Sequence, residues 1–228
     1  MSSNNNRDES IIRIGIDLGT TNSEIAYCDN DEIEILKNAQ GMDYTPSVFG
    51  ISKSGNKIVG KIAYDKLFSG SKEDYANIKR EVKRLMGTNE KIHFSRANRD
   101  FTPEEISSEI IIHLKENISR KYPDAKQIAA VITIPAHFES LQCEATKRAG
   151  ELAGFDYVEL VQEPIAAAIS HGFDDDSNTN ILVYDLGGGT FDVALISSND
   201  GILKVVGHGG DNYLGGKDID RILVDDVI

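Results

Sequence analysis

The chain carries the stretch IGIDLGTT at residues 14–21 and a close copy of its pattern, LVYDLGGGT, at residues 182–190. Each copy consists of an apolar strand, then Asp-Leu-Gly, then a tight turn that contains threonine, and a second strand follows. A pattern that returns in this way indicates an internal duplication, which is informative about the whole architecture. The sequence therefore predicts two similar β-hairpins.

The chemistry of these hairpins suits a metal-bound polyphosphate. Glycines at a strand end allow a close backbone approach, and consecutive amides can form a nest for an anion, to which Thr20, Thr21 and Thr190 add hydroxyl donors. Asp17 and Asp185 would repel a phosphate about 4 Å away by roughly 1 to 4 kcal/mol, and a divalent cation such as Mg²⁺ reverses that sign. Ordinary hairpins in which Gly and Asp serve only the turn are the alternative for either copy alone, and the repetition favours phosphate binding.

The remaining pattern predicts a mixed α/β architecture, because strands alternate with helices. Strands are expected at 11–17, 24–28, 32–36, 128–134, 157–161, 181–185, 191–197 and 202–206, and helical patterns at 61–86, 103–121, 140–152, 164–170 and from 223 onward. The helix after Thr102 has the clearest start, with Pro103 in its first turn and Glu105 completing a capping box. Residues 1–10 have the composition of a disordered tail, and the acidic loop 174–180 is the best candidate boundary.

Composition excludes several functional classes. The net charge of −13 over 228 residues disfavours nucleic acid and anionic membranes as partners. The apolar runs are too short for a signal sequence or a membrane span, and two distant cysteines fit a reducing, cytoplasmic compartment. The five histidines show no metal-ligand spacing, so we interpret them as surface or packing residues, and Cys143 as a half-buried helix residue without a nucleophilic role.

Five motifs in order carry a family resemblance: IDLGTTNS at 16–23, KRLMG at 83–87, EPIAAA at 163–168, DLGGGTFD at 185–192 and GDNYLGG at 210–216. Together they resemble the nucleotide-binding domain of the seventy-kilodalton heat-shock chaperones of the DnaK type, over residues 11–228. The resemblance implies an actin-like, ribonuclease-H-like ATPase fold with ATP in a cleft between two lobes. The first lobe would occupy residues 11–180, and residues 181–228 would only begin the second.

The resemblance also implies roles for individual residues. The phosphate loops and their neighbours that would bind ATP or ADP are Gly19, Thr20, Thr21, Asn22, Gly187, Gly188, Gly189 and Gly216. Asp17 and Asp185 would hold Mg²⁺ largely through its waters, and K⁺ is compatible with the same site. Lys83 would reach the γ-phosphate region, Thr190 would act beside it, and Glu163 and Asp192 would orient or deprotonate the attacking water.

Local alternatives exist for two of these residues. Lys83 lies in the basic run KREVKR at 79–84, and such a run is more often a solvated helix face. Glu163 precedes Pro164 and could simply cap a helix. Their register within the five motifs favours the functional interpretation of both.

Two positions and the length depart from the family pattern. Cys143 stands where the family usually has an arginine associated with communication to the interdomain linker, and Tyr44 stands where threonine is common, so allosteric coupling is in doubt. The second lobe, the linker and the peptide-binding domain are not completed within 228 residues. We therefore expect a fragment that binds and turns over ATP weakly.

The implied partners follow from the same resemblance. They are unfolded client polypeptides, bound through the missing peptide-binding domain, a J-domain co-chaperone and a nucleotide-exchange factor. Two alternatives share the fold: a metabolite kinase, for which no substrate-binding insertion or sugar-facing base is found, and a nucleotide-binding scaffold that does not hydrolyse.

Overall fold

The computed structural model describes residues 11–29, 32–173 and 178–227. The predicted tail, residues 1–10, lies outside the described residues, as does most of the predicted loop at 174–180. No helix in the described part of the chain is long and apolar enough to cross a membrane.

The largest sheet has the order β11-β10-β1-β2-β3, and β4 pairs with β2. Strand β1 (Ile11–Leu18) runs parallel to β10 (Gln127–Ile134), which runs parallel to β11 (Tyr157–Gln162). Strands β2 (Asn22–Asp29), β3 (Glu32–Ile35) and β4 (Thr45–Pro46) continue it in antiparallel fashion. We call this six-stranded sheet the large sheet.

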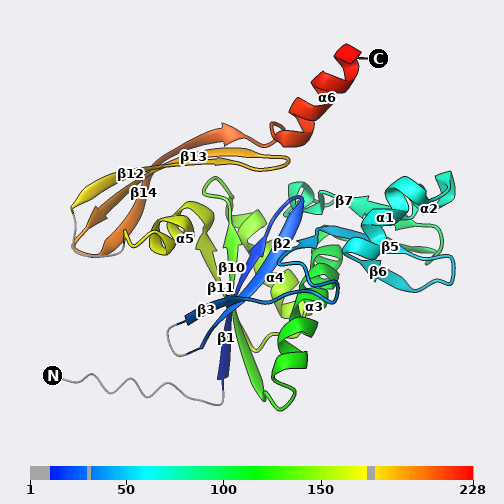
Figure 1. Cartoon of the computed structure of the whole chain (residues 1–228), viewed down its shortest axis with the longest axis horizontal. Helices are drawn as coiled ribbons and strands as arrows, with labels where there is room; N and C mark the ends of the chain where they lie inside the picture. Colours follow the sequence, from blue (N-terminus) through cyan, green and yellow to red (C-terminus); the bar gives the residue numbers. More distant parts are fainter. Residues whose placement is uncertain (1–10, 30–31, 174–177, 228) are drawn as a thin grey trace.

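Helices α3 (Pro103–Lys121) and α4 (Ser140–Leu152) cover one face of the large sheet (Figure 1). Alternate residues of β1 point into this layer, so that Ile14, Ile16 and Leu18 are buried together with Ile132 of β10 and Leu114 of α3. Both helices begin at a capping box, made by Thr102 with Glu105 and by Glu139 with Gln142. These local signals explain why α3 and α4 begin at the predicted residues.

A second sheet follows α5 (Glu163–Ser170) and is an antiparallel meander of β12 (Thr179–Leu186), β13 (Phe191–Asn199) and β14 (Ile202–Asp211). We call it the meander sheet. Helix α5 lies between it and the large sheet (Figure 1). The outer side chains of β12 are open, with Leu182 67% and Tyr184 66% exposed. Helix α6 (Gly216–Val227) extends away from the body and has no buried residue.

A small unit is inserted after β4. It contains the sheet β6-β5-β7 (Lys57–Val59, Val48–Ile51, Ile78–Arg80) and the hairpin β8-β9 (Ile92–Phe94, Arg99–Phe101). The rings of Phe49, Phe94 and Phe101 form its centre, with centroids 5.3 to 5.5 Å apart. Two short helices, α1 (Lys61–Ser69) and α2 (Lys72–Ala76), complete it.

The predicted helical pattern at 61–86 is wrong beyond Ala76. The chain breaks at Gly70, restarts α2 at a capping box of Ser71 with Asp74, and then pairs as β7 with β5. Glu81 adopts a left-handed conformation (φ 60°) that turns the chain into the 3₁₀-helix η1 (Val82–Leu85). Pairing with a distant strand thus overrides a local helical pattern.

The other predicted elements are found with modest shifts. Strand β12 begins at Thr179 and β14 extends to Asp211, so the end of the predicted boundary loop belongs to a strand and the last predicted strand is longer. Helix α6 begins at Gly216, earlier than the expected residue 223. The predicted mixed α/β architecture is confirmed, and the described residues contain six α-helices and the 3₁₀-helix η1.

The core prediction compares two isoleucines of opposite exposure. Ile132→Ala removes a side chain that is 0% exposed under α3 and α4, so we expect a loss of about 2 to 5 kcal/mol in the free energy of unfolding. Ile222→Ala, on the open α6 at 62% exposure, should change it by less than about 0.5 kcal/mol. Urea unfolding followed by circular dichroism measures both, and equal effects would contradict this assignment of the core.

Candidate functional site

The two repeated turns lie against each other. The β1–β2 turn contains Gly19, Thr20 and Thr21, and the β12–β13 turn contains residues 187–190. A Cβ atom on Gly188 would lie 2.6 Å from Thr21 Oγ1, which is closer than real Cβ contacts allow. The absent side chain at Gly188 is therefore what permits the two turns to approach.

The start of α6 closes the same junction. The Gly216 amide donates to Gly187 O at 3.0 Å, and the Lys217 amide donates to Gly188 O at 3.1 Å. A Cβ atom on Gly215 would lie 2.3 Å from the Gly189 amide nitrogen. The structure thus brings together the predicted phosphate-binding residues of both turns and of α6, namely Gly19, Thr20, Thr21, Asn22, Gly187, Gly188, Gly189, Thr190 and Gly216.

The carboxyl ends of three parallel strands supply the reactive side chains. Asp17 lies at the end of β1, His137 follows β10, and Glu163 follows β11 as the first residue of α5. Carboxyl ends of parallel strands share one edge of a sheet, where ligands of open α/β folds bind. This topology is the reason that residues far apart in sequence meet here.

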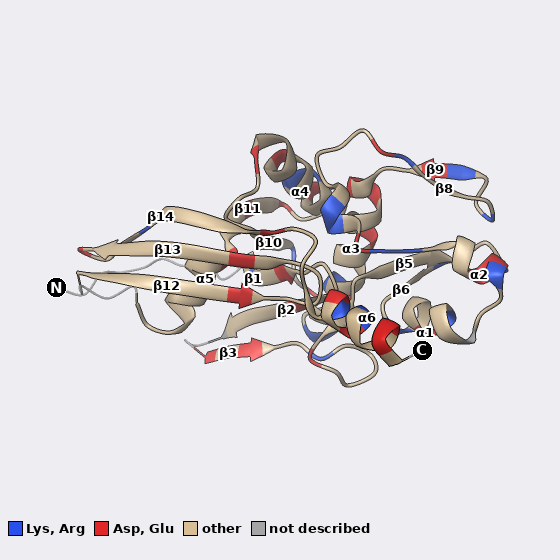
Figure 2. Ribbon diagram, turned by 90° about the horizontal axis from the view of Figure 1, so that it is seen from above, with Lys and Arg blue, Asp and Glu red and all other residues tan. Residues whose placement is uncertain are grey.

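Four carboxylates gather at this edge. The register of the meander sheet pairs Asp185 with Asp192, and Figure 2 shows adjacent acidic segments on β12 and β13. Burial raises the pKa of Asp185, and the charges of Asp192 and Asp17 raise it further. Burial likewise raises the pKa of Glu163, against Lys83, which lowers it, while Asp17 and Asp185 add to the rise. Asp17 and Asp185 therefore lie within electrostatic reach of each other.

Lys83 is the cation closest to this cluster. Its Nζ lies 2.5 Å from Glu163 Oε1 and 5.9 Å from the centroid of the Phe138 ring. The two side chains of the pair are only 10% and 19% exposed. Lys83 is therefore not part of a solvated helix face, because the turn at Glu81 and the 3₁₀-helix η1 direct it inward.

Two cavities meet at this point. The first is lined by Thr20, Lys83, Arg84, Pro135, His137, Phe138, Gln142, Thr190, Asn212 and Tyr213. The second lies between α5 and the meander sheet and includes Glu163, Asp185 and Asp192. They are neighbours, because Lys83 and His137 of the first cavity contact Glu163 and Asp192 of the second. One cavity thus presents cations and hydroxyls, and the other presents carboxylates.

His137 was missed as a site residue by the interpretation of the histidines as surface or packing residues. Its Nδ1 lies 2.7 Å from Asp192 Oδ1, and the two side chains are 23% and 13% exposed. The hydrogen bond to Asp192 raises the pKa of His137, although burial lowers it, and the nearby charges of Asp192 and Glu163 raise it as well. The signal in the sequence was its position just after a buried parallel strand.

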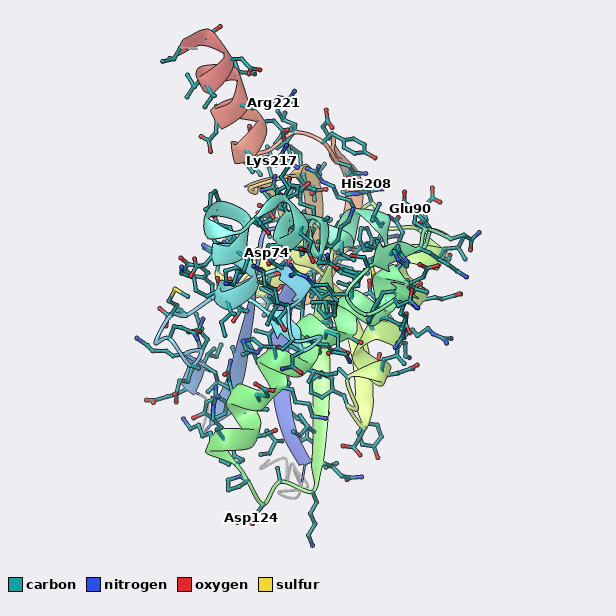
Figure 3. All side chains as sticks on the ribbon, turned by 90° about the vertical axis from the view of Figure 1, so that its right-hand side faces the viewer. Asp74, Glu90, Asp124, His208, Lys217 and Arg221 are labelled. Atoms are coloured by element: carbon teal, nitrogen blue, oxygen red, sulfur yellow. The ribbon has the colours of Figure 1, made fainter. Side chains whose placement is uncertain are left out.

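Glu81, Arg84 and Lys217 form a second group that sequence reasoning missed. Arg84 donates to Gly189 O, forms an ion pair of 3.1 Å with Glu81, and lies 5.3 Å over the ring of Tyr213. Glu81 also pairs with Lys217, which Figure 3 labels at the base of α6. Within this group, the only sequence signal was the place of Arg84 in the motif KRLMG. The contacts themselves were not predictable, because Arg84 and Gly189 are 105 positions apart and Glu81 and Lys217 are 136 positions apart.

The residues fit a hydrated divalent cation better than a fully protein-ligated one. Within the described ranges, no three His, Cys, Asp or Glu side chains are arranged to hold a metal ion. Asp17 accepts a hydrogen bond of 2.7 Å from Thr133 and faces the excess negative charge of Asp185 and Glu163. Mg²⁺ takes few carboxylates and keeps several waters, so this set of donors suits it.

Cys143 is half-buried on α4, as expected, and its Sγ lies 3.8 Å from Phe138 O. Burial raises the pKa of its thiol, which disfavours the thiolate. Tyr44 is 42% exposed beside the buried Thr45. Neither departure from the family pattern touches the carboxylate cluster.

Comparison with known proteins identifies relatives over nearly the whole chain. The family model described as "Hsp70 protein" matches residues 13–228. The "Chaperone protein DnaK" of Metamycoplasma hominis is 45% identical over 213 residues, covering 92% of this chain and 34% of the relative. The "Chaperone protein dnaK" of Cyanidium caldarium is 40% identical over 230 residues, covering 93% and 37%. The chain thus spans about a third of the length of these relatives.

The prediction for this site concerns the ion pair of Lys83 and Glu163, from which a substitution removes the positive charge. Lys83→Met leaves a buried carboxylate uncompensated, so we expect a loss of about 3 kcal/mol in the free energy of unfolding at pH 8. The loss should shrink at pH 4.5, because the pKa of Glu163 is already raised and the uncompensated group can protonate there.

Urea unfolding at both pH values measures this, and the double variant Lys83→Met, Glu163→Gln should recover part of the loss at pH 8. A loss of the same size at both pH values, without recovery in the double variant, would show that the pair has no such role.

Proposed function

Because the chain belongs to the Hsp70 family, we propose that it is the ATP-binding and ATP-hydrolysing part of a DnaK-type chaperone. The observation that carries the proposal is the junction of two glycine turns beside four carboxylates and one buried lysine. A polyphosphate needs amide and hydroxyl donors at its oxygens and a cation to offset its charge, and this junction offers both. An actin-fold metabolite kinase is not favoured, since the Hsp70 model extends over residues 13–228.

The family supports an actin-like ATPase fold, in which residues 11–180 form the first lobe and residues 181–228 begin the second. The separation of the large sheet from the meander sheet is consistent with this division. The open face of β12 and the unpacked α6 are consistent with a second lobe that is only begun.

Each residue of the site has a proposed role. The phosphates are held by the backbone amides of Gly19, Asn22, Gly187, Gly188, Gly189 and Gly216. Hydroxyl hydrogen bonds to the phosphates come from Thr20, Thr21 and Thr190. Asp17 and Asp185 bind Mg²⁺ through its waters, and Mg²⁺ neutralises phosphate charge when bound. ADP would occupy the same site after hydrolysis, and K⁺ would suit the acidic surroundings.

The reacting end of the nucleotide lies, in this proposal, between Lys83 and the carboxylates. Lys83 neutralises negative charge at the γ-phosphate, for which it exchanges its present partner Glu163. Glu163 and Asp192 orient the attacking water or accept its proton, and their partial burial limits competing solvent. Catalysis then consists of positioning and charge neutralisation, with little covalent chemistry for the protein.

Partners and location follow from the family. Client polypeptides would bind through a peptide-binding domain outside this chain, a J-domain protein would stimulate hydrolysis, and an exchange factor would release ADP. Neither nucleic acid nor membrane is proposed as a partner, given the net charge of −13. Two free cysteines in the described residues are consistent with a cytoplasmic location.

The test of this function compares two aspartates of the meander sheet. Asp185→Asn should abolish Mg²⁺-dependent ATP binding and phosphate release, because it removes one carboxylate of the proposed cation site. Asp200→Asn is the control, because it makes the same chemical change at the exposed β13–β14 turn, away from the site. Asparagine also tolerates the positive φ of 50° at this position. Binding of a fluorescent ATP analogue and phosphate release measure both.

Equal activity of the two variants and the parent chain would remove the carboxylate from the mechanism. Binding without phosphate release in the parent chain would favour the non-hydrolysing scaffold.

The 228-residue chain itself should bind ATP weakly and hydrolyse it slowly. The outer side chains of β12 are exposed and α6 has no buried residue, so ordering the second half of the site costs conformational entropy. A titration with the fluorescent analogue measures the affinity. Tight, stoichiometric binding to the isolated chain would contradict this expectation.

A further inference from the structure

His137 connects the two sheets at the site. It follows β10 of the large sheet, and its Nδ1 lies 2.7 Å from Asp192 Oδ1 on β13 of the meander sheet. The side chain of Asn212, in the loop after β14, lines the same cavity as the imidazole. The ring packs edge-on against Phe138, with centroids 5.8 Å apart and an interplanar angle of 85°. The imidazole is therefore fixed by contacts on both sides of the junction.

The arrangement leaves the second carboxylate oxygen of Asp192, Oδ2, without a hydrogen bond from the described residues. A carboxylate has two oxygens that can each accept hydrogen bonds, and His137 binds only Oδ1. No other hydrogen bond to the Asp192 side chain is found among the described residues. Oδ2 is thus held in direction by the bond at Oδ1 and remains able to accept a hydrogen bond from water.

We propose that His137 is a positioning residue for ATP hydrolysis, which acts by fixing the carboxylate of Asp192 toward the attacking water. The proposal rests on the proposed function, in which Asp192 orients or deprotonates that water. His137 itself touches neither water nor phosphate in this role.

The charges around His137 give the role a pH dependence. Asp192 on β13 and Glu163 on α5 face it as anions, Lys83 on η1 approaches the adjoining Phe138 ring, and Asn212 is a neutral side chain in the same cavity. An imidazolium neutralises Asp192 and weakens it as a proton acceptor, whereas the neutral ring still donates from Nδ1. Because the pKa of His137 is raised by Asp192, hydrolysis should increase as pH rises through a midpoint above the usual value for histidine.

The experiment uses single-turnover hydrolysis of Mg-ATP by the full chain, with the protein in excess, across pH 5.5 to 9. His137→Ala should lower the rate constant by on the order of 10-fold at pH 8, within the range that misplacement of a catalytic group causes. His137→Gln keeps an N–H donor that does not titrate, so it should recover most of the rate and lose the acidic limb of the profile. The dissociation constant of a fluorescent ADP analogue should change less than about 3-fold in both variants.

A matched control is His208→Ala, because His208 is an exposed histidine on β14 of the meander sheet, which also carries Asp192 (Figure 3). It should leave the rate and the pH profile unchanged. The titration of the His137 ring, followed by nuclear magnetic resonance, gives a readout that is independent of hydrolysis. Asp192→Asn should lower its midpoint, since the charged partner is lost.

The outcomes separate this inference from the proposed function. If His137→Ala keeps the parent rate and pH profile while Asp185→Asn is inactive, the positioning role is overturned and the ATPase function stands. If the parent chain releases no phosphate above the Asp185→Asn background, the function and the positioning role fall together. A His137 midpoint that does not respond to Asp192→Asn overturns the pairing on which the role depends.

Discussion

The mutual repulsion of four carboxylates is the constraint around which this structure is organised. Burial raises the pKa of Glu163 and of Asp185, and the charge of Asp17 raises both further. A protein selected for stability alone would not gather these groups at a half-buried edge, and perturbed ionisation of this kind is typical of functional sites. Lys83 offsets part of the repulsion from one side, and His137 contacts Asp192 from the other.

The topology explains why the repulsion between the carboxylates is concentrated at one edge of the large sheet. Strands β1, β10 and β11 are parallel, so the residues after each of them must emerge together, and the α3–α4 layer holds the three strands in register. The meander sheet then needs only one hairpin to present its two aspartates, because β12 and β13 pair Asp185 with Asp192 directly. Stability in the large sheet thus supports the electrostatic strain at its edge.

Much of this arrangement could be predicted because its signals are local. The duplicated Asp-Leu-Gly turns located both hairpins, and the capping box of Thr102 with Glu105 gave the start of α3. Prediction failed where a distant contact decides the outcome. The region after Ala76 forms β7 because β5 pairs with it, and Glu81 then reverses the chain direction into η1. The contact of His137 with Asp192, 55 positions away, is likewise a distant one.

The present pairing of Lys83 has a consequence for how ligands bind. When Lys83 exchanges Glu163 for a phosphate, as proposed, Glu163 adds an uncompensated charge to the remaining carboxylates. That added charge strengthens the attraction of the cluster for a cation, while a bound cation lowers the cost of releasing Lys83. In the proposed function, anion binding at Lys83 and cation binding at Asp17 and Asp185 would therefore be coupled, and the coupling would be reciprocal. A nucleotide that arrives together with its metal ion would then satisfy both halves of the proposed site at once.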